Sequence, residues 1–89
     1  MGAKKAEDVV IRVEPSQANY FRSAPKHHSQ KEIEPIDGWP AFTYHIAPTY
    51  DFKQELLSHG AFVEVLSPES LRQEMAEAAA EMNRIYVKK

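Results

Sequence analysis

The sequence predicts a small α+β domain, because four β-rich runs alternate with two short helical segments and one long helix closes the chain. A chain of 89 residues is long enough to bury one core. The order strand, helix, strand, strand, helix, strand is typical of a ferredoxin-like βαββαβ sandwich. We therefore expect a four-stranded antiparallel sheet with helices on one face, plus an additional C-terminal helix. The domain should span residues 8–87, between a flexible N-terminal tail at residues 1–7, which resembles a cloning boundary, and a tail at residues 88–89.

The first strand and helix are predicted near the N-terminus. Residues 8–13 are mostly β-branched and apolar, which favours a central strand. Pro15 fits the first turn of a short helix, whose predicted body is residues 17–23 and whose inner face carries Phe21. Pro25 ends this helix, because the residue before a proline disfavours the helical region.

A hairpin follows. Residues 29–36 carry a weak strand pattern, and residues 41–46 alternate between apolar and polar side chains. The pair Asp37-Gly38 between them is a turn signal. We therefore expect two paired strands with one buried face.

The second half of the fold repeats the pattern of helix and strand. Thr49 is the expected N-cap of a second helix that ends near Ser58, and Gly60 is the expected left-handed residue after its end. Residues 62–66 are apolar enough for the fourth strand.

The last helix is predicted over residues 68–86, with Ser67 as its cap and Pro68 in its first turn. Its apolar residues step by four, three, four and three, which places them in one stripe. The members of this α-helical stripe are Leu71, Met75, Ala78, Met82 and Ile85. The stripe could cover the domain's own sheet, extend the helical layer, or pack on a second chain. The candidate interface residues are Leu71, Met75, Met82 and Ile85.

Composition excludes several classes of function. The chain has no cysteine, so it can form neither a disulfide nor a thiolate metal site. Its four histidines are not spaced as metal ligands, and no serine lies in a nucleophile elbow. The three glycines build no phosphate loop. We therefore expect no enzyme activity, no metal site and no cofactor.

The net charge is −2, and four of the eleven basic residues are lysines at the two ends of the chain. The body is therefore acidic, which argues against a broad footprint for duplex DNA. The exception is the segment of residues 12–31, where Glu14 is the single acid and where Arg12, Tyr20 and Arg22 precede Lys26 and two histidines. Aromatic and basic side chains together can stack bases and neutralise phosphate. The alternative is that Phe21 belongs to the core and that the cations only keep an acidic domain soluble.

Several motifs occur in a familiar order. The most specific are Leu56-Leu57-Ser58-His59-Gly60 and Val63-Glu64-Val65-Leu66-Ser67-Pro68-Glu69-Ser70-Leu71-Arg72, followed by Tyr86 near the end. From about Asp8 to Tyr86 the chain resembles the C-terminal extension, called WCX, of bacterial WYL-domain transcriptional regulators. In that family a winged helix-turn-helix and a WYL domain precede the extension, which is implicated in dimer contacts and effector sensing.

The resemblance implies a cytoplasmic, non-catalytic regulatory and dimerisation module. Its partners would be the WYL and helix-turn-helix domains of the same parent chain and a second copy in a homodimer, without a membrane. Effectors in the family are thought to include single-stranded nucleic acids or nucleotides, and the residues at the matching positions are Tyr20, Arg22, His28 and Gln30. The helix-turn-helix and the Trp-Tyr-Leu hallmark are missing from this chain. The alternative function is a stand-alone ferredoxin-like domain that binds a small molecule or another protein.

Overall fold

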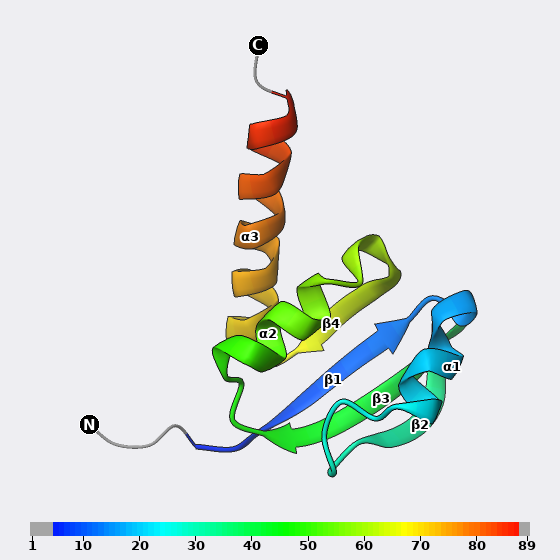
Figure 1. The fold of residues 1–89 in the computed structure, drawn as a ribbon. Helices are drawn as coiled ribbons and strands as arrows, with labels where there is room; N and C mark the ends of the chain where they lie inside the picture. Colours follow the sequence, from blue (N-terminus) through cyan, green and yellow to red (C-terminus); the bar gives the residue numbers. More distant parts are fainter. Residues whose placement is uncertain (1–4, 88–89) are drawn as a thin grey trace.

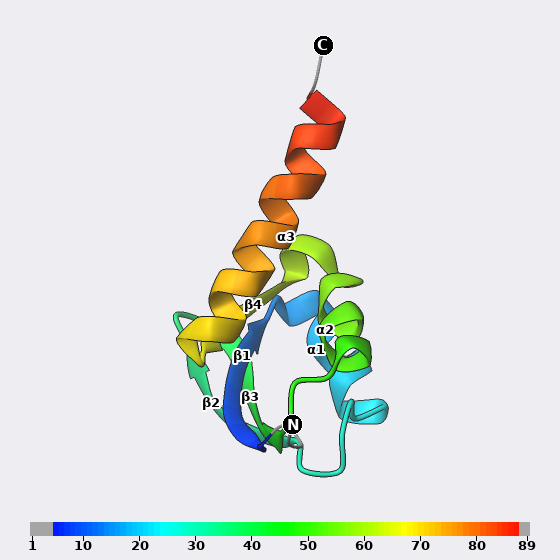
Figure 2. The ribbon, with the colours of Figure 1, turned by 90° about the vertical axis from the view of Figure 1, so that its left-hand side faces the viewer.

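Four antiparallel strands form one sheet in the order β2-β3-β1-β4, and the helices α1 and α2 lie together on one of its faces (Figures 1 and 2). The structure is a computed structural model that describes residues 5–87. Its elements are β1 (Glu7–Val13), α1 (Pro15–Ser23), β2 (Lys31–Ile36), β3 (Trp39–Ile46), α2 (Tyr50–Leu57), the short 3-10 helix η1 (Gly60–Phe62), β4 (Val63–Ser67) and α3 (Glu69–Val87). The predicted α+β fold, its four-stranded antiparallel sheet and its extra C-terminal helix are thereby confirmed. The predicted tail residues 1–4 and 88–89 lie outside the described residues.

The core lies between the sheet and the two short helices. From Val9 onward every second residue of β1 is fully buried, as expected for a central strand. Phe21 of α1 stacks on Phe42 of β3 with their ring centroids 5.7 Å apart. Tyr44 of β3 meets Phe52 of α2 edge to face at 5.3 Å. These aromatic contacts fix both helices against the same face of the sheet.

The helix ends follow the predicted chemistry with small shifts. Thr49 caps α2 as predicted, because its hydroxyl accepts a hydrogen bond from the amide of Phe52 at 3.3 Å. Gly60 has a φ of 59°, the expected left-handed conformation, although it begins η1 and lies two residues beyond the C-cap Ser58. The first helix begins at Pro15, which lies in its first turn as predicted.

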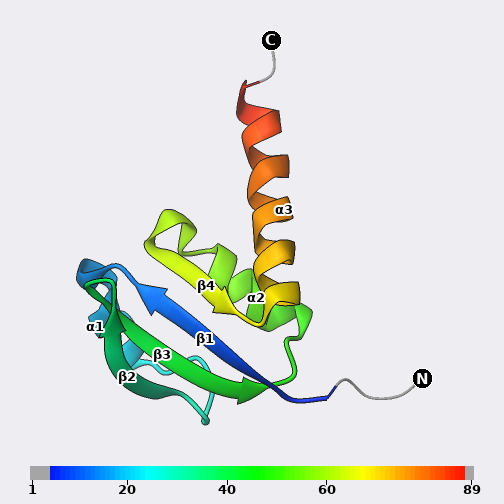
Figure 3. The ribbon, with the colours of Figure 1, turned by 180° about the vertical axis from the view of Figure 1, so that it is seen from behind.

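The start of α3 differs slightly from the prediction. Ser67 is the last residue of β4 and is joined to Pro68 by a cis peptide bond. The helix itself begins at Glu69. From there α3 rises away from the sheet, so that its C-terminal half stands clear of the other elements (Figures 1, 2 and 3).

Candidate functional site

The apolar stripe of α3 is divided between the domain's own core and solvent. Leu71 is 2% exposed and belongs to the core, and Met75 packs against that core. Farther along, Met82 is 46% exposed and Ile85 is 60% exposed. Of the four predicted interface residues, Leu71 therefore stabilises the domain itself, whereas Met82 and Ile85 are accessible to a partner.

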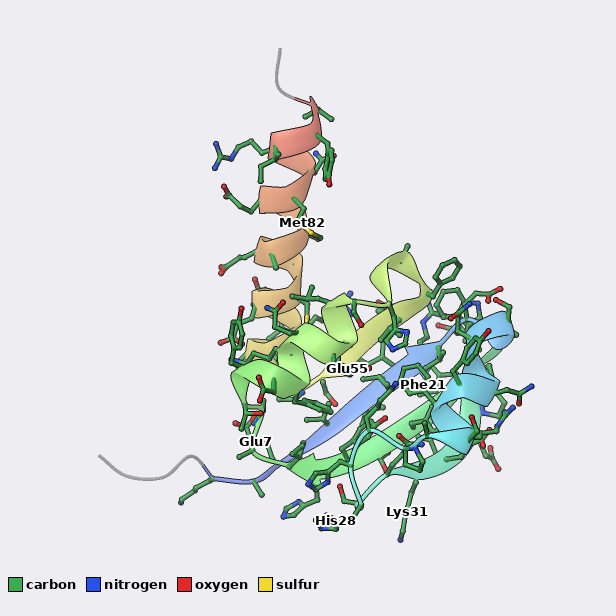
Figure 4. All side chains as sticks on the ribbon, in the orientation of Figure 1. Glu7, Phe21, His28, Lys31, Glu55 and Met82 are labelled. Atoms are coloured by element: carbon green, nitrogen blue, oxygen red, sulfur yellow. The ribbon has the colours of Figure 1, made fainter. Side chains whose placement is uncertain are left out.

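An apolar groove runs beside the stripe. It has a volume of about 360 Å³ and lies between α3 and the segment that includes α2, η1 and β4. Its walls include Leu57, Ala61 and Val63 on one side and Met75, Ala79 and Met82 on the other. Figure 4 shows Met82 on the upper part of α3, above α2. Met82 lines the groove, and Ile85 and Tyr86 follow it three and four residues later on the exposed part of the helix. We call the groove together with Met82, Ile85 and Tyr86 the α3 surface.

Contacts on both flanks of α3 hold its first two turns. Lys53 of α2 forms an ion pair with Glu74 at 2.7 Å. On the other flank, Arg72 donates hydrogen bonds to Glu64 at 2.8 Å and to the carbonyl of Val65 at 2.9 Å. The direction in which α3 leaves the domain is therefore set by these contacts together with the buried Leu71.

The predicted basic and aromatic segment carries less free charge than its sequence implies. Arg22 donates two hydrogen bonds to the carboxylate of Glu32, at 2.8 and 2.7 Å, and a third to Asn19. The hydrogen bond from Arg22 holds the pKa of Glu32 below its usual value, so the pair is neutral overall near pH 7. Lys26 likewise pairs with Glu55 at 3.0 Å.

Gln30 is part of the structure of the loop between α1 and β2. Its amide nitrogen donates to the carbonyl of Phe21 at 2.8 Å. Its amide oxygen accepts from the hydroxyl of Tyr44 at 2.7 Å and from the backbone amide of Lys26 at 3.0 Å. These bonds fasten the loop to α1 and β3.

The other two predicted effector residues remain accessible. Tyr20 is 61% exposed, and His28 is exposed at the tip of the loop (Figure 4). His28 lies against His27, with the ring centroids 4.1 Å apart. The four predicted residues therefore have different roles in this structure: two are tied into the fold and two are free to contact a ligand.

The same loop contains a serine and histidine in contact. Ser29 Oγ lies 2.7 Å from His27 Nδ1, and that nitrogen also accepts the backbone amide of Ser29 at 3.2 Å. The Ser29 oxygen in turn accepts the backbone amide of His45 at 2.9 Å. Both side chains thus close the loop onto β3.

Sequence patterns did not reveal a cluster on the sheet face opposite α1 and α2. There Arg12 of β1 donates from Nε to Glu64 of β4 at 2.7 Å, and Arg72 reaches the second oxygen of the same carboxylate. The guanidinium of Arg12 lies over the ring of Trp39, 4.6 Å from its centroid. Strand alternation could have placed Arg12 and Glu64 on this face, but their pairing depends on the register between β1 and β4.

Neither a metal site nor a membrane span is found in the described part of the chain. Within residues 5–87, no group of three or more histidine, cysteine, aspartate or glutamate side chains is arranged to hold a metal ion. No helix among these residues is long and apolar enough to cross a membrane.

Comparison with known proteins identifies the family. The family model of the WCX domain matches residues 5–82, which is most of the chain and includes both motifs on which the resemblance rested. A comparison with curated proteins found no match. The chain therefore belongs to the WCX domain family, the C-terminal extension of WYL-domain transcriptional regulators.

Proposed function

We propose that this chain is a non-catalytic regulatory module that helps a WYL-family regulator to dimerise through the α3 surface. The observation that supports this proposal is the exposure of large apolar side chains along the last turns of α3. Met82, Ile85 and Tyr86 are 46%, 60% and 85% exposed. An apolar surface of this kind beside a groove is typical of an interaction site.

The size of the domain supports the same function. A domain of 89 residues gains limited stability from its own core, and association is a common way to add more. The first turns of α3 are packed on the domain, and its last turns are exposed to solvent. The helix therefore presents its exposed apolar residues to a partner in a fixed direction. In a symmetric dimer the same helix would be used by both copies.

The family suggests the wider context. The parent chain would carry a helix-turn-helix and a WYL domain before this module, and the module would help to transmit effector binding to the dimer. Tyr20 and His28, which are accessible, remain candidate contacts for a nucleic-acid or nucleotide effector. We assign no catalytic step to the chain, because the contact between Ser29 and His27 serves to close a loop.

We also classify the body of the domain as ferredoxin-like. Each of its two βαβ units is split by one strand of the other unit, because β3 lies between β1 and β2 while β1 lies between β3 and β4. This interleaving is expected of the split βαβ arrangement.

Sedimentation equilibrium tests the dimerisation role. The double variant Met82→Glu, Ile85→Glu should shift the chain from dimer toward monomer, because two buried charges in an interface are costly. The matched control is Ala80→Glu, Asn83→Glu, which adds the same charge to exposed positions outside the stripe. Deletion of everything after Ser67 is a poor test, because it also removes Leu71 from the core.

The outcomes are distinct. A dimer that dissociates in the stripe variant but persists in the control supports the proposal. A monomer for the unmodified chain up to high protein concentration contradicts it and favours the stand-alone binding domain. Equal dissociation in both variants would show that charge, and not the apolar stripe, controls association.

A further inference from the structure

The cluster of Arg12, Glu64, Arg72 and Trp39 has an excess of positive charge. Two guanidinium groups share the carboxylate of Glu64. In the other ion pairs that arginines and lysines form within the described residues, a single arginine or lysine pairs with each carboxylate. Hydrogen bonds from Arg72 and Arg12 hold the pKa of Glu64 below its usual value. The carboxylate is therefore ionised at neutral pH, and the cluster carries one net positive charge in a chain whose net charge is −2.

Both guanidinium groups keep donors to spare. Within residues 5–87, the bonds to Glu64 and to the carbonyl of Val65 use one nitrogen of Arg12 and one of Arg72. An arginine has five N–H donors in a rigid fork, so several remain on each side chain. The side chain of Arg72 is 46% exposed. The side chain of Arg12 is 22% exposed. A hollow of about 240 Å³, lined in part by Glu64, Arg72 and Ala76, opens beside Arg72.

The contacts also orient the two arginines in advance. Glu64 holds them from both of its oxygens, and Trp39 supports the flat face of Arg12. The three strands β3, β1 and β4 and the first turn of α3 supply these four residues, and all of these elements are fixed by the core (Figure 3). A site whose donors are already positioned loses less entropy on binding.

We propose that Arg12 and Arg72, with Trp39 beside them, bind a phosphate group. Phosphate is favoured over a carboxylate because it carries up to two charges and three free acceptor oxygens, which suits two guanidinium forks. The aromatic ring of Trp39 allows a phosphate that is attached to a planar ring system to stack next to its anchor. This inference goes beyond the dimerisation role and does not depend on it, since the cluster lies on β1, β3, β4 and the first turn of α3.

NMR titration of the 89-residue chain with inorganic phosphate, at constant ionic strength, tests the site. The indole N–H of Trp39 and the backbone amides of Arg12 and Arg72 should shift together. Arg72→Gln should weaken binding about tenfold, because one charged fork is lost. The matched control is Arg22→Gln, which removes the same charge from an exposed arginine that is also paired with a glutamate.

A second variant separates binding from folding. Glu64→Gln removes the competing negative charge but keeps a side-chain oxygen that can still accept a hydrogen bond from an arginine. Phosphate should therefore bind several times more tightly, a gain that a damaged fold cannot produce. Weaker binding to this variant would contradict the proposal. Equal weakening by Arg72→Gln and Arg22→Gln would also overturn it, and so would the absence of any shift at Trp39.

Three ligands distinguish the source of the phosphate. Inorganic phosphate, a nucleoside monophosphate and the same nucleoside without phosphate are titrated in parallel. Tighter binding of the monophosphate than of inorganic phosphate supports a ligand whose ring stacks near Trp39, and equal binding supports free phosphate. If the nucleoside binds as tightly as its monophosphate, the phosphate is not the recognised group and the proposal fails.

Discussion

Leu71 and Ile85 lie on the same stripe of α3, yet we expect the same truncation to have different effects at the two positions. Leucine and isoleucine are isomers, so Leu71→Ala and Ile85→Ala remove the same number of carbon atoms. Leu71 is 2% exposed and packed in the core, and such a truncation costs about 2–5 kcal/mol. Ile85 is 60% exposed in the single chain, so its loss should change the monomer's free energy of unfolding by less than about 0.5 kcal/mol.

Urea unfolding followed by circular dichroism measures both effects. At low protein concentration, where the chain is monomeric, Leu71→Ala should lower the unfolding midpoint and Ile85→Ala should leave it nearly unchanged. At high concentration the Ile85 variant should also fall behind the unmodified chain, because it loses the stabilisation that a dimer adds. If Ile85→Ala is as destabilising as Leu71→Ala in the monomer, the end of α3 packs on the domain and the argument for a free interaction surface is wrong.

Three further predictions concern the interior and the loops. Burial raises the pKa of Tyr44 above its ordinary value of 10.0, so the unfolded chain loses this proton first and stability should fall as the pH rises above about 10. Tyr44→Phe should flatten that alkaline loss in urea unfolding measured from neutral to high pH. Gln30→Ala should cost about 1–3 kcal/mol and speed amide exchange in the loop before β2, because it leaves the Phe21 carbonyl without its bond. Gly60→Ala should lower stability by about 1 kcal/mol in thermal melts, because its φ of 59° strains any residue with a Cβ atom, whereas Gly60→Asn should cost less.

Local sequence signals predicted the elements well because each signal acts over a few residues. Thr49 needs only the next turn of α2 to act as a cap, and Gly60 needs only its own backbone to be left-handed. The strand over residues 8–13 likewise follows from the β-branched side chains of that run alone. These predictions are confirmed, with element ends that shift by one or two residues.

The sites were harder to predict because they depend on how distant segments meet. The cations of residues 20–31 look free in the sequence, but Arg22 is neutralised by Glu32, which the chain brings close only when β2 packs beside α1. The convergence of Arg12 and Arg72 on Glu64 requires both the strand register and the direction of α3. A stripe with helical spacing shows which face is apolar, and it leaves open how much of that face the domain covers.

The edges of the sheet make helix pairing a better route to a dimer than strand pairing. The outer strand β2 carries Lys31 and Glu32 and includes Pro35, which cannot donate a backbone hydrogen bond. At the other outer strand, β4, Arg72 binds the carbonyl of Val65 and the first turns of α3 lie alongside. The charges and the proline therefore disfavour the addition of another strand at β2, and α3 blocks it at β4. The large apolar side chains at the end of α3 have no such protection in the single chain, so a second copy is expected to meet the domain there.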